Sequence, residues 1–305
     1  MSDLPHFDAD AIYSIGMAKA IKILESGSIE PIEPIPRSHV PLGKGNDFLM
    51  MPAISPKGIG VKLVTVFPEN PKRNFPLIHG HYLYCDRETG RPLATLDGSA
   101  LTTLRTPAAS AVATNVLARS NVRTLGIFGA GVQARGHVEA MLLVRPEINE
   151  IVIRSQSVDS SRRFIDSLNV ENRKIRIGQP EDVAVCDVIC SCTTSNEPVI
   201  PTESIHSGSH LNLVGSYSTA RREADSQLLN LVEIFVDHRD AAMKEAGELI
   251  LANNEGSWSF DQIIGDFSDL VNGRTGRTND EQITLFKSVG LATWDLLVAD
   301  SIINK

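Results

Sequence analysis

Short apolar segments alternate with helix-compatible segments between residues 120 and 240. The apolar segments read VRTLGIF, EIVIRS, KIRIG, DVICSCT, HLNLVG and EIFVD, and each is bounded by Gly, Asn, Ser or Pro. Most of them are too short to be helices, and this alternation is typical of a parallel sheet covered by helices. The pattern therefore predicts an α/β domain with a doubly wound parallel sheet over residues 113–280.

The flanking segments follow a different pattern. Residues 1–112 contain many prolines and the strand-like runs GIGVKLVTVF and PLIHGHYLYCD, which indicate an antiparallel or mixed sheet. Residues 99–118 predict a connecting helix, in which Pro107 is tolerated only at a first turn or a kink. Apolar spacings of three and four predict an amphipathic helix over 281–305 that folds back on the first domain. We therefore expect a second, α+β domain from residues 1–112, completed by 281–305.

One glycine-rich turn indicates a dinucleotide site. The run TLGIFGAGVQA leads from a strand candidate into G-x-G-x-x-A, formed by Gly129, Gly131 and Ala134. The first glycine permits the tight turn, the second lets the backbone approach a pyrophosphate, and the following helix presents free N–H groups. A purely structural turn is the alternative, but the flanking strand and helix favour a Rossmann-type nucleotide site. Its expected contacts are Gly129, Ala130, Gly131, Val132 and Gln133.

The end of the next strand bears on which dinucleotide binds. An acidic residue there suits the ribose hydroxyl of NAD, whereas arginine and small hydroxyl residues suit the 2′-phosphate of NADP. Here the strand ends in Arg154 and Ser155, and the nearest carboxylate, Asp159, lies where the next helix should begin. We therefore expect NADPH, with weaker binding of NADH.

Other cofactor contacts are expected where later strands end, because ligands of this fold bind at the carboxyl ends of parallel strands. The candidates there, which are equally compatible with plain turn residues, are Thr193, Thr194, Gly215 and Ser216. Thr106 is expected to reach the phosphates from the connecting helix.

Composition narrows the range of partners. The chain has 29 Lys and Arg against 37 Asp and Glu, and its formal net charge of -8 argues against nucleic acid as the main partner. No apolar run has the length needed to span a bilayer, so we expect no membrane association and a cytoplasmic location. Three of the four cysteines lie in the apolar run VAVCDVICSCTT without a matching His or Cys cluster, so no metal site is expected.

Three basic residues in the first domain lie in apolar or turn-like settings. Arg37 follows EPIP, Lys62 interrupts GIGVKLVTVF, and Arg105 lies within LTTLRTP. A lysine between apolar neighbours is costly to bury unless it meets an anion, and arginine binds carboxylates through two parallel hydrogen bonds. Taken singly, each is also compatible with an ordinary surface or salt-bridged residue. A carboxylate substrate is one anion that would account for all three.

Several long motifs occur in a characteristic order: VKLVTVFPENP, CDRETGRPLATLDGSALTTLRTPAASAVAT and GIFGAGVQA. With them the chain resembles the ornithine cyclodeaminase and mu-crystallin family over nearly its whole length. The resemblance implies an N-terminal substrate-binding and dimerisation domain, completed by the C-terminal helix, together with a Rossmann domain, and hence a homodimer. It also implies that Arg37, Lys62 and Arg105 hold a substrate carboxylate next to the nicotinamide.

One departure from the family pattern bears on the reaction. Cyclodeaminases and archaeal alanine dehydrogenases of the family carry Gly-(Gly/Ala)-Asp after the fifth strand, where this chain has Gly215, Ser216 and Tyr217. Loss of the acid disfavours ornithine cyclisation, which needs proton transfer, more than it disfavours reduction of a cyclic imine. We therefore expect an NADPH-dependent reductase of Δ1-pyrroline-2-carboxylate, with Δ1-piperideine-2-carboxylate as a second candidate substrate, forming L-proline or L-pipecolate.

The expected roles follow from that reaction. Lys62 and Arg105 are the expected catalytic residues, and Arg37, Lys62, His81 and Arg105 are the expected contacts of the small imino acid. The proton would come from Lys62, His79, His81 or a water molecule. Two alternatives remain, namely an amino-acid enzyme such as ornithine cyclodeaminase or alanine dehydrogenase with another proton path, and a non-catalytic binding protein like mu-crystallin.

Overall fold

The chain forms two compact units. The computed structural model describes residues 4–28, 35–216 and 218–304. The first unit comprises Met1–Arg105 with Leu291–Lys305, and the second comprises Thr106–Gly290. These divisions fall at residues 105 and 290, whereas the sequence analysis placed them at 112 and 280.

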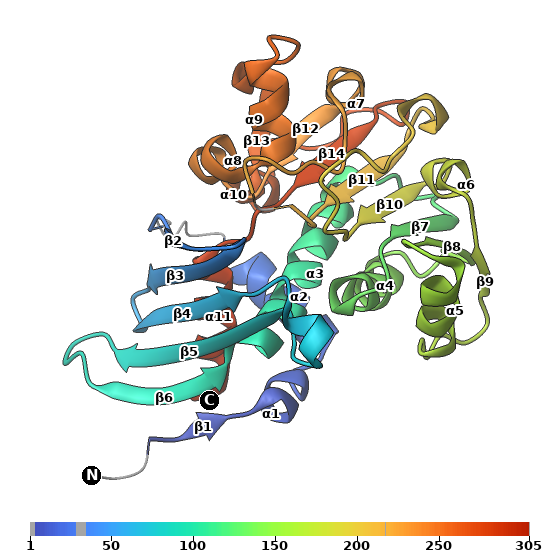
Figure 1. Cartoon of the computed structure of the whole chain (residues 1–305). Helices are drawn as coiled ribbons and strands as arrows, with labels where there is room; N and C mark the ends of the chain where they lie inside the picture. Colours follow the sequence, from blue (N-terminus) through green and yellow to red (C-terminus); the bar gives the residue numbers. More distant parts are fainter. Residues whose placement is uncertain (1–3, 29–34, 217, 305) are drawn as a thin grey trace. The chain divides into compact units, whose positions relative to one another are not determined.

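The second unit is built on eight parallel strands in the order β13-β12-β14-β11-β10-β7-β8-β9 (Figure 1). All six strands predicted from the sequence are present, and the α/β fold with its parallel sheet is confirmed. The strand order reverses between β7 and β10, which is the point where ligands bind in open sheets of this kind. The strands are β7 (Thr124–Phe128), β8 (Glu150–Arg154), β9 (Lys174–Ile177), β10 (Val188–Ser191), β11 (His210–Leu213), β12 (Glu233–Val236), β13 (Ile263–Asp266) and β14 (Thr284–Lys287).

Strand β14 corrects the prediction of one helix over 281–305. Its sequence TLFK pairs with β11 on one side and β12 on the other, and all four residues are buried. A run of four residues is too short to show whether its apolar period is two or 3.6, so the pattern of the helix that follows dominated the prediction. The helix itself begins only at Ala292.

Helices cover the parallel strands and supply the rest of the core. Helix α4 packs against β7 and β10, α5 against β8 and β9, and α6 against β7 and β8. Leucine, isoleucine and valine side chains from β10, β11, β12 and β14 meet in one buried cluster. The helices are α4 (Val132–Val144), α5 (Val158–Asp166), α6 (Pro180–Ala184), α7 (Ser226–Leu231), α8 (Arg239–Glu245), α9 (Gly247–Asn254) and α10 (Phe267–Val271).

The first unit is a six-stranded sheet with helices on one side. The strand order is β1-β6-β5-β4-β3-β2, in which only the β1–β6 pair is parallel among the described residues. Helix α11 packs against β3, β4 and α2, so the C-terminal segment completes this α+β unit. The elements are β1 (His6–Phe7), α1 (Ala9–Tyr13), α2 (Met17–Gly27), β2 (Ser38–Gly43), β3 (Asn46–Ile54), β4 (Gly58–Val66), β5 (Ile78–Asp86), β6 (Pro92–Asp97) and α11 (Ala292–Ile303).

Helix α3 (Gly98–Leu117) carries the chain from the first unit into the second. Pro107 lies inside this helix, ten residues into its length rather than in its first turn. A proline has no N–H group, so the carbonyl of Thr103 lacks the hydrogen bond that an ordinary residue would provide. The division between the units falls at Arg105, close to this interruption.

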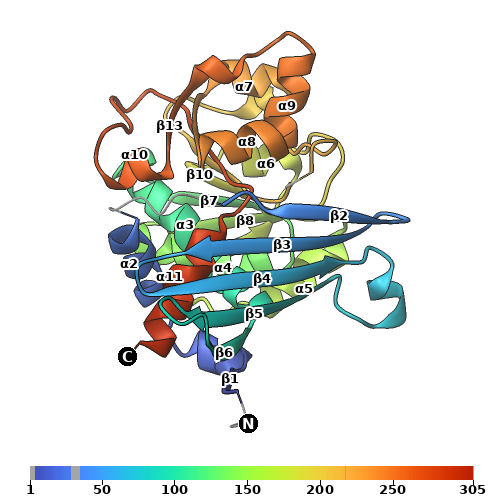
Figure 2. The same cartoon turned by 90° about the vertical axis from the view of Figure 1, so that its left-hand side faces the viewer.

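The side of the first sheet that faces away from α11 is mostly apolar. Residues paired across β3, β4 and β5 share a face, and Met50, Leu63 and His81 lie opposite one another in this way. Figure 2 shows this side of strands β3, β4 and β5 toward the viewer, with α11 behind them. We call it the open face and define it by its exposed or half-buried residues Val40, Phe48, Met50, Ile54, Val61 and Leu63.

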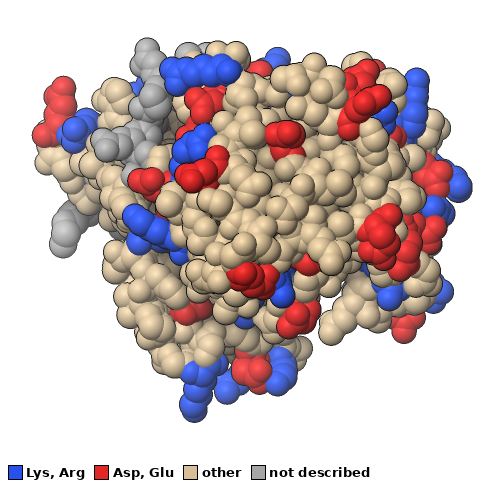
Figure 3. Space-filling view, turned by 90° about the horizontal axis from the view of Figure 1, so that it is seen from above, with Lys and Arg blue, Asp and Glu red and all other residues tan. Residues whose placement is uncertain are grey.

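The outer surface is of mixed charge where it can be seen from above. Basic and acidic side chains are interspersed on the face drawn in Figure 3, and the coloured residues form no broad basic area there. Among the described residues, no helix combines the length and apolar character needed to cross a bilayer.

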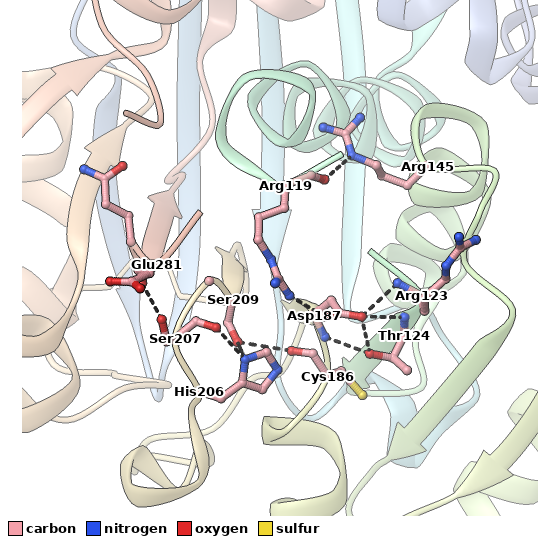
Figure 4. A network of polar contacts seen from close by, with 12 residues as sticks. Arg119, Arg123, Thr124, Arg145, Cys186, Asp187, His206, Ser207, Ser209 and Glu281 are labelled. Atoms are coloured by element: carbon pink, nitrogen blue, oxygen red, sulfur yellow. Dashed lines mark hydrogen bonds and ion pairs between the residues drawn. The ribbon is translucent and has the colours of Figure 1, made fainter. Parts of the chain in front are cut away.

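A half-buried carboxylate joins the amino ends of two central strands in the second unit. Asp187, which precedes β10, accepts hydrogen bonds from the N–H of Arg123, from the N–H and hydroxyl of Thr124, and from the Arg119 guanidinium at 2.7 Å (Figure 4). Burial opposes ionisation of Asp187, but these donors outweigh it, so the pKa of the carboxyl group is lowered. This network lies at the strand ends opposite the glycine-rich turn.

Asp187→Asn should lower the melting temperature at neutral pH, because it removes a charge from several hydrogen bonds at once. We expect a loss of about 2 kcal/mol, or roughly 4–8 °C. A carboxyl group whose pKa is depressed by folding stabilises the fold above its ordinary pKa, and this contribution disappears as the pH falls through the depressed value. The difference in melting temperature between the variant and the wild type should therefore become smaller at acidic pH. Calorimetry across pH checks this, with the exposed Asp159→Asn as the control.

Candidate active site

The glycine-rich turn has the geometry expected of a nucleotide-binding turn. Gly129 has φ of +112°, in a region that L side chains rarely adopt. A Cβ atom on Gly129 would lie 2.7 Å from the carbonyl oxygen of Cys192, which follows the neighbouring strand β10. Backbone shape and close packing therefore both require glycine between β7 and α4.

The next glycine leaves the helix end open. Gly131 is the N-cap of α4, it forms no side-chain cap, and a Cβ atom placed on it would meet nothing within 4 Å. Val132, which begins the helix, is 64% exposed. The first N–H groups of this 13-residue helix thus face open space, as a bound pyrophosphate requires. These residues fit a dinucleotide.

The loop after β8 is held by its own hydroxyl groups. The N–H of Ser155 donates to Ser161 Oγ at 3.1 Å, and Ser157 caps α5 by accepting from the N–H of Ser160. Arg154 ends β8, and its carbonyl accepts from the N–H of Gly129 at 2.8 Å, which joins this loop to the glycine turn. Asp159 lies in the first turn of α5, as its position in the sequence suggested.

A carboxylate that sequence reasoning missed organises the other strand ends. Glu223 is fully buried and accepts from the hydroxyl of Ser191 at 2.6 Å, from the N–H and hydroxyl of Thr193 at 2.7 and 2.8 Å, and from the N–H of Gly215 at 2.8 Å. It therefore links the ends of β10 and β11. The N–H and the hydroxyl of Thr193 both donate to Glu223. The hydroxyl of its neighbour Thr194 has no hydrogen-bond partner among the described residues.

Glu248 and Lys287 extend this buried cluster. Glu248 is 1% exposed and pairs with Lys287 at 3.0 Å. The N–H of Glu223 donates to Glu248, and Lys287 donates to the carbonyl of Ser216 at 2.7 Å. Burial raises the pKa of Glu223, and the charge of Lys287 opposes this. The cluster orders the Gly215–Ser216 turn through contacts that no local pattern in the sequence reveals.

Two further expectations concern this edge of the sheet. Thr106 is buried on α3. Tyr217, which replaces the family's acid, lies outside the described residues. Asp225 caps α7 by accepting from the N–H of Leu228, so it serves the following helix.

In the first unit, two of the predicted cations share one buried carboxylate. Lys62 Nζ lies 2.7 Å from Oδ2 of Asp295 and donates to Oδ1 at 2.9 Å, while Arg105 Nε donates to the same Oδ1 at 3.2 Å. Lys62 is 1% exposed and Asp295 is fully buried. Lys62 also donates to the hydroxyl of Thr102 at 2.8 Å. Sequence reasoning missed Asp295, although an acidic residue within the apolar helix sequence ATWDLLVADSII was a signal.

Arg37 and Trp294 complete the surroundings of these cations. The charge of Arg37 acts on Lys62, and the Arg105 guanidinium lies 5.8 Å from the ring centre of Trp294. We call Arg37, Lys62 and Arg105 the cation cluster. Burial lowers the pKa of Lys62 from its ordinary value to about 7, the Asp295 carboxylate raises it, and the two arginines lower it further. Two of the three positive groups, Lys62 and Arg105, thus contact the one negative group.

Tyr82 is a further buried polar group beside this cluster. It is paired with Lys62 across β4 and β5, and its hydroxyl forms no hydrogen bond within the described part of the chain. Burial raises its pKa, and the charge of Asp295 acts in the same direction, so the phenol is neutral.

The structure does not bring His81 to the cation cluster. His81 pairs with Leu63, whereas Lys62 pairs with Tyr82, and successive residues of a strand point to opposite faces. His81 therefore belongs to the open face, as does His79, which is paired with Thr65. The structure therefore does not place His81 beside Lys62 within one chain, and its contact with the substrate stays a prediction.

The chain matches the profile of the ornithine cyclodeaminase/mu-crystallin family over residues 16–305. It belongs to this family. It is 34% identical over 293 residues to a Δ1-pyrroline-2-carboxylate reductase from Bacillus thuringiensis, with 94% of this chain and 90% of that protein covered. The resemblance inferred from sequence motifs is therefore confirmed.

Solved structures of family members agree with this assignment. A Thermococcus litoralis Δ1-pyrroline-2-carboxylate reductase in complex with NADH and L-proline superposes with a TM-score of 0.95 at 30% identity, covering 99% of this chain and 97% of that one. An archaeal alanine dehydrogenase dimer with bound NAD gives 0.93 at 28% identity, covering 99% and 95%. These relatives are oxidoreductases with nicotinamide cofactors, the enzyme class that the sequence analysis predicted.

Proposed function

We propose that this protein is an NADPH-dependent reductase of cyclic imino acids, with Δ1-pyrroline-2-carboxylate as its first substrate and Δ1-piperideine-2-carboxylate as its second. The observation that carries the proposal is the cation cluster. Among the described residues, the hydrogen bond of Arg105 uses only Nε. Its two terminal nitrogens are therefore left to bind a carboxylate in the parallel geometry that arginine favours.

The charge of the cluster suits a single carboxylate. Arg37, Lys62 and Arg105 contribute three positive charges and Asp295 one negative charge, so a net charge of +2 remains when Lys62 is protonated. A buried excess of positive charge is unfavourable until an anion arrives. An imino acid with its carboxylate beside the reacting C=N carbon would be both bound and oriented by these groups.

The reaction adds a hydride to the C=N carbon and a proton to the ring nitrogen, which converts C=N into CH–NH. The nicotinamide cofactor supplies the hydride when it is bound. Lys62 is suited to deliver the proton, because a lysine with a pKa of about 7 exists in both protonation states near neutral pH. The neutral amine that remains takes a proton from water.

The alternatives are supported less well. Ornithine cyclodeaminases and alanine dehydrogenases of the family carry an acid where this chain has Tyr217, and the nearby carboxylates Glu223 and Asp225 are engaged in other contacts. A non-catalytic binding protein would not need a lysine with a lowered pKa beside its ligand-binding arginines.

NADPH is the preferred cofactor in this proposal. Arg154 ends β8 next to the hydroxyls of Ser155 and Ser157, a combination that suits the 2′-phosphate, and the carboxylate of Asp159 is 77% exposed on the first turn of α5. The Thermococcus litoralis relative was solved with NADH, so this preference is a property to be tested on this chain.

We also propose that the protein is a homodimer that buries the open face. A contiguous apolar sheet face is unusual on the surface of a monomer, and a second copy presents the same apolar surface. The dimeric state of the archaeal alanine dehydrogenase supports this.

The central test is NADPH oxidation in the presence of freshly prepared Δ1-pyrroline-2-carboxylate. We expect turnover, with far less activity toward pyruvate plus ammonia and none toward ornithine with NAD. Absence of turnover with both cyclic imines would overturn the proposed function.

Arg105→Ala should raise KM for the imino acid by roughly 10- to 100-fold, because a hydrogen bond to a charged group contributes about 1.5–3 kcal/mol. Arg105→Lys, which keeps the charge but loses the two parallel donors, should give an intermediate value. Arg91→Ala, at an exposed arginine of the same unit, is the matched control. An unchanged KM for Arg105→Ala would contradict the carboxylate-binding role.

Fluorescence titration should show tighter binding of NADPH than of NADH. Arg154→Ala should weaken NADPH binding by about tenfold or more, with little change for NADH, because only NADPH carries the 2′-phosphate. Tighter binding of NADH by the wild type would show that the expected cofactor preference is wrong.

Leu63→Asp should convert the dimer to a monomer, because it places a charge in the middle of the open face. Light scattering after size-exclusion chromatography measures the mass. Leu143→Asp alters an equally exposed leucine on α4 of the second unit and should leave the dimer intact. A monomeric wild type, or a dimeric Leu63→Asp, would exclude this interface.

A further inference from the structure

Asp295 contacts both Lys62 and Arg105. Its Oδ1 accepts from Lys62 Nζ at 2.9 Å and from Arg105 Nε at 3.2 Å, and its Oδ2 lies 2.7 Å from Lys62 Nζ. Its side chain is completely buried, so no water competes for these contacts. One carboxylate therefore determines the separation and orientation of two cations that come from different elements, β4 and α3.

The remaining contacts of Lys62 show which of its protons are engaged. The hydroxyl of Thr102 donates to the carbonyl of Gly98 at 2.9 Å, so it can only accept from Lys62. Within the described residues, the hydrogen bonds to Thr102 and Asp295 use two of the three N–H groups of the ammonium. Oδ2 of Asp295 also lies 2.7 Å from the same nitrogen, and together these contacts hold the ammonium in a fixed direction.

We propose that Asp295 is a positioning residue for the reduction, which orients Lys62 and Arg105 and keeps Lys62 protonated for delivery of its proton to the imine nitrogen. This inference rests on the proposed function. Asp295 touches no substrate atom in this scheme. It acts through the two cations, one of which binds the carboxylate while the other delivers the proton.

The charges around Lys62 support this role. Arg105 from α3 and Arg37 favour the neutral amine, the Tyr82 phenol from β5 is uncharged, and Asp295 from α11 is the group that favours the ammonium. Burial favours the neutral amine as well. Without the carboxylate, the buried Lys62 and Arg105 and the half-buried Arg37 would have no negative charge between them, and Lys62 would lose its proton at a lower pH.

The same helix provides a matched control. Asp300 is also buried on α11 and also holds this helix to the sheet, because it accepts from the hydroxyls of Tyr84 at 2.5 Å and Ser55 at 3.1 Å. It contacts neither Lys62 nor Arg105 among the described residues. A substitution of Asp300 therefore shows how activity changes when α11 is held less firmly to the sheet while the contacts of Lys62 and Arg105 remain.

The experiment compares Asp295→Asn with Asp300→Asn in the full-length protein. At pH 7, Asp295→Asn should lower kcat/KM for Δ1-pyrroline-2-carboxylate by about 100-fold or more, as expected when a proton donor is lost. The fall of kcat/KM on the alkaline side should also move to lower pH, because Lys62 then deprotonates earlier. Asp300→Asn should keep the wild-type pH profile and most of the activity, even if its melting temperature falls.

Three outcomes would overturn the inference. The first is an alkaline fall of kcat/KM at the same pH in Asp295→Asn and the wild type, and the second is an equal loss of activity in Asp295→Asn and Asp300→Asn. The third is that Lys62 loses its proton at the same pH in the wild type and in Asp295→Asn. The last is measured without turnover, by ¹⁵N NMR of the lysine amines, with Lys62→Met to assign the signal. This separates the inference from the proposed function. If the wild type reduces no cyclic imine but its Lys62 titrates at higher pH than in Asp295→Asn, the proposed function fails while the control of Lys62 by Asp295 stands.

Discussion

The first unit depends on the contact between Lys62 and Asp295. A protonated lysine that is 1% exposed is highly unfavourable without a partner, and the carboxylate supplies one at 2.7 Å. The same carboxylate comes from α11, so the ion pair also fastens the C-terminal helix to the sheet. An ion pair of this kind is a poor source of stability compared with apolar packing. The presence of the Asp295 carboxylate is better explained by the two cations, Lys62 and Arg105, that it holds in place.

In the second unit, buried carboxylates also hold polar groups from separate elements together. Glu223 collects donors from the ends of β10 and β11, and Glu248 joins it to Lys287 at the end of β14. The loops that follow strands are usually the most variable parts of a fold. In the second unit the buried carboxylates hold the strand ends in fixed positions. In the first unit a buried carboxylate does the same for two side chains from different elements. Precise placement of this sort matters where a ligand must be held to within a fraction of an ångström.

Much of the architecture could be predicted from the sequence, because it is encoded locally. The apolar segments before and after the glycine turn form strands of a parallel sheet, and Gly129 has the positive φ that its motif implies. Strand β14 was missed because four buried residues carry no readable period. The side of the sheet on which His81 lies could not be predicted, because it depends on the pairing register of β4 and β5. Asp295 and Glu223 were missed because their partners are distant in sequence, and only the folded chain brings them together.

The order in which the ribosome makes this chain has a consequence for the first unit. Lys62 and Asp295 are separated by 233 residues, and the whole second unit lies between them. At about 5–20 residues per second, roughly 10 to 50 seconds pass between synthesis of the lysine and synthesis of its counter-ion. During that time the N-terminal sheet has a charge that it cannot bury and lacks the helix that covers it. The second unit is complete before α11 exists, so we expect it to fold first and the N-terminal unit to close around α11 last.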